Sequence, residues 1–183
     1  MYVLSVYKFR LYPDEEQEKT LNSQLKICKE LYNRAYHERL EHYEKTGMGL
    51  TYAEQANALP EMKKEKPELA TVHSQVLQDV LKRLDTSFVN FFEGRTKYPH
   101  TKNYVSNITY PRQVPSGFTR TALRCRRLEG WGWMVKHRKV RGKVKTITVK
   151  KYKNGEWYAI IAVEMKEPKE IKNPVGADSG LTC

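Results

Sequence analysis

The sequence has few cysteines and no long apolar segment. Its three cysteines, Cys28, Cys125 and Cys183, lie far apart, form no CxxC pair and never fall at ligand spacing with any of the five histidines. This pattern predicts neither a disulfide scaffold nor a zinc site within these residues. The longest apolar run, from Tyr158 to Val163, is far shorter than the about 20 residues that span a bilayer. We therefore expect no membrane partner.

The N-terminus also lacks the features of an export signal. Residues 1–8 contain no charged leader followed by a long apolar segment, so we expect a cytoplasmic protein. At 183 residues, with 39% apolar residues and twelve tyrosines, the chain is long enough to bury the core of one or two domains.

Acidic residues are almost absent from one part of the chain. Between Thr119 and Lys153 there are thirteen basic residues and one acid, Glu129, so this segment accounts for the whole net charge of +12. A basic segment on a neutral body predicts a nucleic-acid site, and the alternative is a solvated basic surface. The cations that we assign to the predicted site are Arg124, Arg126, Arg127, Lys136, Arg138, Lys139, Arg141, Lys143 and Lys145.

Hydrophobic periodicity predicts one strand and three helices in the first half of the chain. Residues 1–12 alternate as a strand, and residues 13–45 have a single apolar helical stripe formed by Leu21, Leu25, Cys28, Tyr32 and Ala35. Thr51 and Glu54 have the spacing of a capping box that starts a second helix, which breaks by Pro67. A third helix ends near Gly94 and carries one apolar face, formed by Leu77, Leu81, Leu84, Phe88 and Phe91.

Short extended segments dominate the second half. Strands are predicted at residues 107–112, 133–139, 143–152 and 156–165, and Asn154-Gly155 supplies a tight turn between the last two. Residues 156–165 are apolar on both faces, which favours a central position in a sheet or barrel. The predicted fold class is therefore α+β.

A single acid follows the apolar residues near the C-terminal end. In Val175-Gly176-Ala177-Asp178-Ser179-Gly180-Leu181, a predicted strand delivers Asp178 to its exposed end, where a carboxylate can bind a metal ion. The alternative is an ordinary turn without chemistry.

Six segments occur in an order that is typical of one protein family. They are Lys8-Phe9-Arg10-Leu11-Tyr12-Pro13 with Gln17, Tyr32-Asn33, Gly49-Leu50-Thr51-Tyr52, Leu77-Gln78 with residues 84–92, residues 142–149 with 157–164, and Val175 to Leu181 around Asp178. Together they resemble the N-terminal portion of the TnpB family, also called OrfB. Members of this family are RNA-guided DNA endonucleases that are encoded by insertion sequences and related to type V CRISPR effectors.

The resemblance implies a domain plan for the chain. Residues 1–12 and 95–167 would form an oligonucleotide-binding-like β-barrel, the wedge domain, with a helical recognition domain inserted at residues 13–94. Residues 168–183 would be a linker and the first strand of a truncated RuvC-like nuclease domain, related to ribonuclease H. Asp178 would then be the first catalytic carboxylate and a Mg²⁺ ligand. Because two-metal hydrolysis needs several carboxylates, these residues alone are not expected to cleave DNA.

The resemblance also implies the binding partners, namely a guide RNA of the omega type and target DNA that carries a short adjacent motif. It assigns Tyr52 and Gln78 to that motif, because Gln can contact adenine and Tyr can pack on a thymine methyl group. Structural roles are the alternatives, with Tyr52 packing at the start of its helix and Gln78 solvated. For the whole chain, the alternatives are a nuclease-dead RNA-guided DNA-binding regulator and a generic RNA-binding barrel protein.

Overall fold

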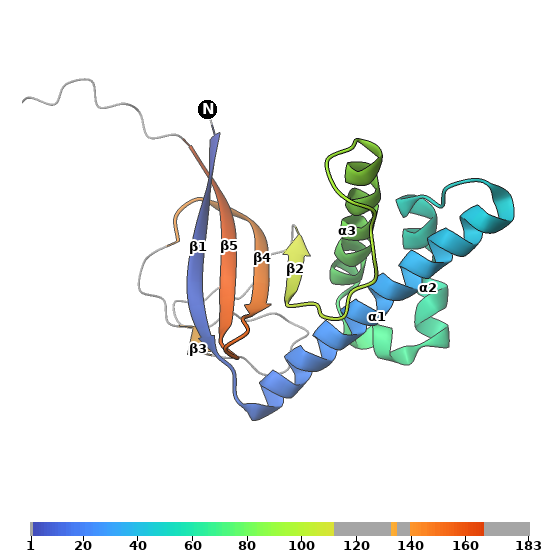
Figure 1. Cartoon of the computed structure of the whole chain (residues 1–183). Helices are drawn as coiled ribbons and strands as arrows, with labels where there is room; N and C mark the ends of the chain where they lie inside the picture. Colours follow the sequence, from blue (N-terminus) through green and yellow to red (C-terminus); the bar gives the residue numbers. More distant parts are fainter. Residues whose placement is uncertain (1, 112–132, 135–139, 167–183) are drawn as a thin grey trace, which may run out of the picture.

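The strands and helices follow the predicted order in the computed structural model, which describes residues 2–111, 133–134 and 140–166 (Figure 1). The elements are β1 (Tyr2–Tyr12), α1 (Glu15–Thr46), α2 (Tyr52–Glu65), the 3₁₀ helix η1 (Pro67–Thr71), α3 (Ser74–Phe92), β2 (Asn107–Pro111), β3 (Trp133–Met134), β4 (Lys143–Lys151) and β5 (Trp157–Lys166). The α+β class is confirmed. Within these ranges, no helix combines the length and the apolar character that a membrane crossing requires.

One antiparallel sheet contains all five strands, in the order β2-β4-β5-β1-β3. Strand β5 lies in the centre, as predicted, and pairs with both β1 and β4. The predicted barrel is not confirmed, because the sheet remains open over the described part of the chain. Among the described residues, its two edges are β2 and β3.

The sheet has one buried face and one open face. Phe9 of β1 and Ile161 and Val163 of β5 are completely buried. Residues of opposite parity point the other way and are partly or fully exposed. We call this side the open face, and its members are Val6, Lys8, Arg10 and Tyr12 of β1, Tyr158, Ile160 and Ala162 of β5, and Thr148 and Lys150 of β4.

A short loop joins β4 to β5, as the Asn154-Gly155 pair predicts. The N–H of Tyr152 donates to the Glu156 carbonyl at 2.8 Å, and the N–H of Gly155 donates to the Tyr152 carbonyl at 3.0 Å. Gly155 has a φ of +83°, so the loop of three residues ends in the left-handed conformation that glycine favours.

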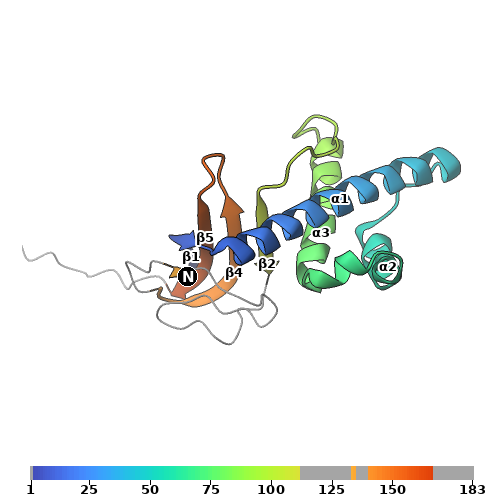
Figure 2. The same ribbon diagram turned by 90° about the horizontal axis from the view of Figure 1, so that it is seen from below.

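Capping residues fix the ends of the first two helices. Asp14 and Gln17 form a capping box at the start of α1, and Gly47, with a φ of +70°, ends it in the left-handed conformation. The predicted capping box of Thr51 and Glu54 is confirmed at the start of α2. The 32 residues of α1 span about 48 Å, and Figure 2 shows α1 running from the sheet past β2 to the helices.

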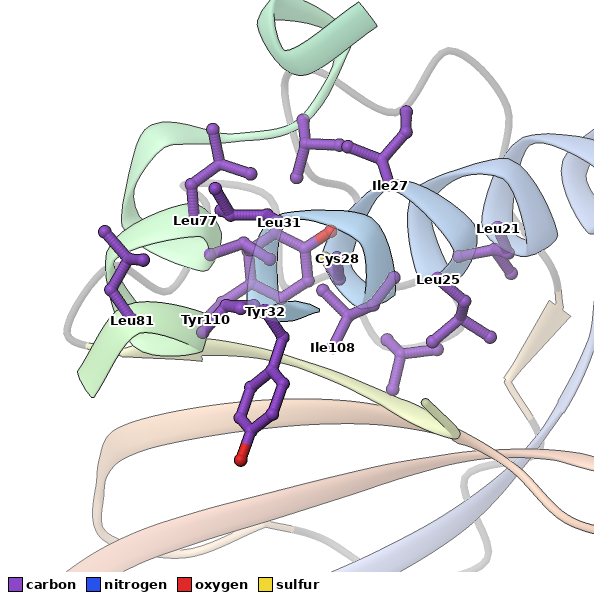
Figure 3. Packing of buried hydrophobic residues seen from close by; sticks show 14 of the residues in the cluster. Leu21, Leu25, Ile27, Cys28, Leu31, Tyr32, Leu77, Leu81, Ile108 and Tyr110 are labelled. Carbon is purple, nitrogen blue, oxygen red and sulfur yellow. The ribbon is translucent and has the colours of Figure 1, made fainter. Parts of the chain in front are cut away.

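The predicted apolar stripe of α1 is buried against α3 and β2. In Figure 3, Leu25, Cys28 and Tyr32 of α1 lie close to Ile108 and Tyr110 of β2. Side chains of α3 complete this layer, and Leu77, Leu81 and Leu84 are fully buried. The buried residues of the helices and of the sheet form one continuous hydrophobic cluster.

Polar contacts attach the sheet to the helices at two places. Glu18 of α1 accepts hydrogen bonds from Lys151 Nζ at 2.8 Å and from Trp157 Nε1 at 3.3 Å, and these bonds lower the pKa of Glu18. Arg83 of α3 donates to the side chains of Asn107 and Thr109 on β2. The hairpin end of the sheet and its β2 edge therefore both have fixed positions relative to the helices.

Candidate nucleic-acid interface

The structure places the two predicted motif-reading residues near each other on the helical part of the chain. Tyr52 is the first residue of α2, and Gln78 lies in α3. Lys82 follows Gln78 by one helical turn on the same side of α3, and its Nζ lies 5.1 Å from the centre of the Tyr52 ring. Tyr52 and Gln78, which are 26 residues apart in sequence, therefore border the same surface.

The two residues differ in how much the fold uses them. Tyr52 is half-buried and packs against the hydrophobic core, so it has the structural role that was its alternative reading. Its ring also contacts Lys82 at the surface. Gln78 is exposed, and its side chain makes no hydrogen bond to any described residue. The amide of Gln78 is thus available to a ligand.

A buried polar network fixes the position of Tyr52 relative to α3. Gln55, one turn after the start of α2, accepts a hydrogen bond from Arg39 Nε at 2.8 Å and donates to the Ala35 carbonyl at 2.9 Å. Arg39 Nη2 lies 3.2 Å from Asp85 Oδ1 on α3. Because Arg39 and Gln55 are both buried, this network holds α1, α2 and α3 in one arrangement.

Only the C-terminal end of the predicted basic segment lies within the described residues. Arg141 and Lys143 are exposed at the start of β4. Lys145 Nζ lies 3.0 Å from Glu164 Oε2, next to a register irregularity between Val144 and Thr146. The remaining predicted cations are outside the described residues, namely Arg124, Arg126, Arg127, Lys136, Arg138 and Lys139.

The open face of the sheet contains cations that we did not predict as site residues. We had used Lys8 and Arg10 only as part of a family motif, although both alternate with the apolar Tyr7, Phe9 and Leu11 along the strand. Lys150 joins them because β4 pairs with β5, which pairs with β1. Arg10 forms an ion pair with Glu156. The sequence did not show that these cations share one face, because strand order is set by contacts between distant segments.

The predicted catalytic carboxylate cannot be placed in this arrangement. Asp178 lies outside the described residues, so its role as a metal ligand stays a prediction. Among residues 2–111, 133–134 and 140–166, no group of three or more His, Cys, Asp and Glu side chains could hold a metal ion.

Comparison with known proteins finds one matching family model and two similar curated proteins. A family model described as a helix-turn-helix domain, of the OrfB type, matches residues 1–48. In the structure these residues form β1 and one uninterrupted helix, so no turn separates two helices there.

Two curated relatives match more of the sequence. The chain is 31% identical over 189 residues to "Putative RNA-guided DNA endonuclease InsQ" of Escherichia coli (strain K12), which covers 97% of this chain and 46% of the relative. It is 33% identical over 119 residues to "Putative RNA-guided DNA endonuclease" of Streptomyces pristinaespiralis, covering 64% of this chain and 30% of the relative. The chain thus spans less than half the length of each of these relatives.

Proposed function

Because the chain belongs to the TnpB/OrfB family, we propose that it is the part of an RNA-guided DNA endonuclease that binds guide RNA and target DNA. The observation that carries this proposal is the shared surface formed by Tyr52, Lys82 and Gln78. The family resemblance assigns the first and third of these residues to one DNA motif. Their neighbouring positions on separate helices support that assignment.

The chemistry of this surface suits a short duplex motif. The exposed Gln78 amide can donate to and accept from the major-groove edge of adenine, which distinguishes adenine from the other bases. Lys82 lies one helical turn away, and its Nζ is 2.9 Å from Asp85 Oδ2. This exposed side chain can exchange that ion pair for a contact with a phosphate, which would set the register of the protein on the duplex. The half-buried Tyr52 offers a rigid ring edge that can pack on a thymine methyl group.

The basic residues have a different task in the proposed function. A protein that leaves sequence reading to base pairing needs mainly backbone contacts to the guide RNA and to the guide–target heteroduplex. The exposed Arg141 and Lys143 can supply such contacts, and we assign the same role to the basic residues between 124 and 139. We further propose that the wedge domain is a barrel, and that the open sheet is the part of this barrel that the structure describes.

Cleavage would need acidic ligands in addition to Asp178. In the proposal Asp178 supplies one carboxylate to a Mg²⁺-dependent phosphodiester cleavage site, and residues 1–183 by themselves bind nucleic acid without cutting it. Two-metal hydrolysis requires several acidic ligands, and the resemblance assigns only one of them to residues 1–183.

RNA that copurifies with the chain provides the first test. The protein is purified, the bound RNA is sequenced, and the complex is then presented with a DNA library that is randomised beside the matched target. We expect a defined RNA and a preference at the randomised positions. The proposal fails if no RNA copurifies and the chain binds no nucleic acid even at low salt.

Gln78→Ala tests the assignment of the motif reader. Loss of a bidentate contact should weaken binding to the preferred DNA by about 5-fold to 150-fold and reduce the preference at one position. Thr86→Ala, at another exposed position of α3, is the matched control and should leave the preference unchanged. Equal effects of the two substitutions would exclude Gln78 as a reader.

A further inference from the structure

Three tyrosines outside the buried core lie on or beside the open face. Tyr12 ends β1 and is 50% exposed, while Tyr152 and Tyr158 are partly buried on the β4–β5 hairpin. The rings of Tyr152 and Tyr158 meet edge to face, with their centres 5.1 Å apart. By contrast, Tyr32 and Tyr110 are buried between the helices and β2. Core packing therefore does not account for the surface tyrosines.

Cations alternate with these rings. Lys8 Nζ lies 4.4 Å from the centre of the Tyr152 ring and 4.1 Å from that of Tyr158. Lys150 Nζ lies 4.8 Å from the Tyr152 ring. Arg10 Cζ lies 5.2 Å from the Tyr12 ring and 5.9 Å from the Tyr158 ring. We call this set of three cations and three tyrosines the basic–aromatic cluster.

The cluster has an excess of positive charge. Its acidic neighbour Glu156 pairs with Arg10 and also accepts a hydrogen bond from the Tyr158 hydroxyl at 2.9 Å. Neither Lys8 nor Lys150 has an acidic partner among the described residues. A hydrogen bond with Lys8 lowers the pKa of Tyr152, as expected where the local potential is positive. The cluster thus attracts anions next to aromatic rings that are partly or fully exposed.

The combination of rings and cations selects one form of nucleic acid. A duplex presents phosphates but keeps its bases stacked on each other, so it would contact the cations but not stack on the tyrosine rings. An unpaired strand presents phosphates together with free base faces, and every base can stack on an aromatic ring. Lys8 and Lys150 have long flexible side chains, so each can move from a ring to a phosphate when a base arrives.

We propose that the basic–aromatic cluster binds unpaired nucleotides, whose bases stack on Tyr12, Tyr152 and Tyr158 and whose phosphates contact Lys8, Arg10 and Lys150. This inference rests on the proposed nucleic-acid function and specifies which part of the chain takes a single strand. It concerns a different surface from that of Tyr52 and Gln78, which is suited to a duplex.

The test compares single-stranded and duplex ligands. Fluorescence anisotropy of the 183-residue chain is measured with a labelled 12-nucleotide oligouridine, with oligothymidine of the same length, and with a duplex. Tyr158→Leu and Tyr12→Leu keep apolar bulk but remove a ring, and each should weaken single-strand binding by about 5-fold to 150-fold. Duplex binding should change less than twofold. The tighter of the two single strands shows whether the nucleotides are RNA or DNA.

Two further variants complete the design. Tyr104→Leu removes a tyrosine that is 59% exposed and lies outside the cluster, so it should leave single-strand binding unchanged. Lys150→Gln should weaken single-strand binding and reduce the slope of log affinity against log salt by about 0.7. Tyr12 lies at a strand end, so Tyr12→Leu should leave the fold intact. If Tyr158→Leu perturbs folding, Tyr12→Leu alone still tests the inference.

The outcomes separate this inference from the proposed function. If the wild-type chain binds RNA or duplex DNA but the Tyr12 and Tyr158 variants match Tyr104→Leu, the inference is wrong and the proposed function stands. Equal losses for duplex and single strand would also overturn it. Absence of all nucleic-acid binding at low salt would overturn both.

Discussion

Replacement of Gly142 by alanine should destabilise the sheet more than the same change at Gly155. Gly142 precedes β4 with a φ of +100°, and an added Cβ would lie 2.6 Å from the Glu164 carbonyl oxygen and 2.6 Å from Met165 Cγ. The Met165 side chain can move, whereas the Glu164 backbone is fixed because it pairs with β1 on one side and β4 on the other. Gly155 has a similar φ of +83°, but a Cβ there meets nothing within 4 Å.

The two substitutions therefore share backbone strain and differ in steric overlap. A left-handed backbone costs an L-residue about 1–2 kcal/mol, which is the full expected cost of Gly155→Ala. Forcing a methyl group against a packed backbone adds about 1–3 kcal/mol, so Gly142→Ala should cost about 2–5 kcal/mol. Urea unfolding followed by tryptophan fluorescence measures both free energies of unfolding. Equal costs would show that the approach of Gly142 to β5 does not contribute to stability.

Three other substitutions or treatments test the described contacts. Hydrogen bonds from Lys151 and Trp157 hold the pKa of Glu18 below its ordinary value of 4.5. The free energy of unfolding should therefore decrease as pH falls from about 4.5 through the folded-state pKa of Glu18. Glu18→Gln should remove that part of the decrease. Parallel pH profiles of the two proteins, measured by urea unfolding, would contradict this account. Burial raises the pKa of the Cys28 thiol to about 12. In a variant with serine at the other two cysteines, iodoacetamide at pH 8 should therefore modify this thiol only after the protein is unfolded. Mass spectrometry would detect the modification. Leu84→Ala, at a fully buried position of α3, should cost about 2–5 kcal/mol in urea unfolding, and a cost below 1 kcal/mol would mean that the α3 core is not packed as described.

Features that depend on neighbouring residues were predictable from the sequence. The capping box of Thr51 and Glu54 and the Asn154-Gly155 turn involve groups within a few residues of each other, and both occur as predicted. The apolar stripe of α1 is equally local, since residues three and four apart share a helical face. The central position of β5 was also correct, because a strand that is apolar on both faces needs neighbours on both sides.

Features that depend on distant residues were not predictable in the same way. The strand order brings Lys150 next to the β1 cations through two ladders, and no local pattern in the sequence encodes those pairings. The expected barrel required closure between β2 and β3, which the described residues do not show. Tyr52 and Gln78 were assigned through family resemblance alone, and their role in DNA reading stays a prediction. Lys82, which borders both, was missed because its importance depends on how α2 packs against α3.

The pairing of β1 with β5 sets the order in which the sheet can fold during synthesis. Paired residues in this ladder are between 146 and 164 positions apart, so β1 leaves the ribosome long before its central partner exists. At about 5–20 residues per second, the wait is roughly 7 to 30 s. During this time the helices can form from local contacts, whereas β1 has both edges free and exposes Val3, Leu4 and Val6, which are still 40%, 69% and 60% exposed in the final fold. Nascent β1 is therefore open to unwanted pairing until its partner strand has been made, and a chaperone or a bound ligand would protect it during this time.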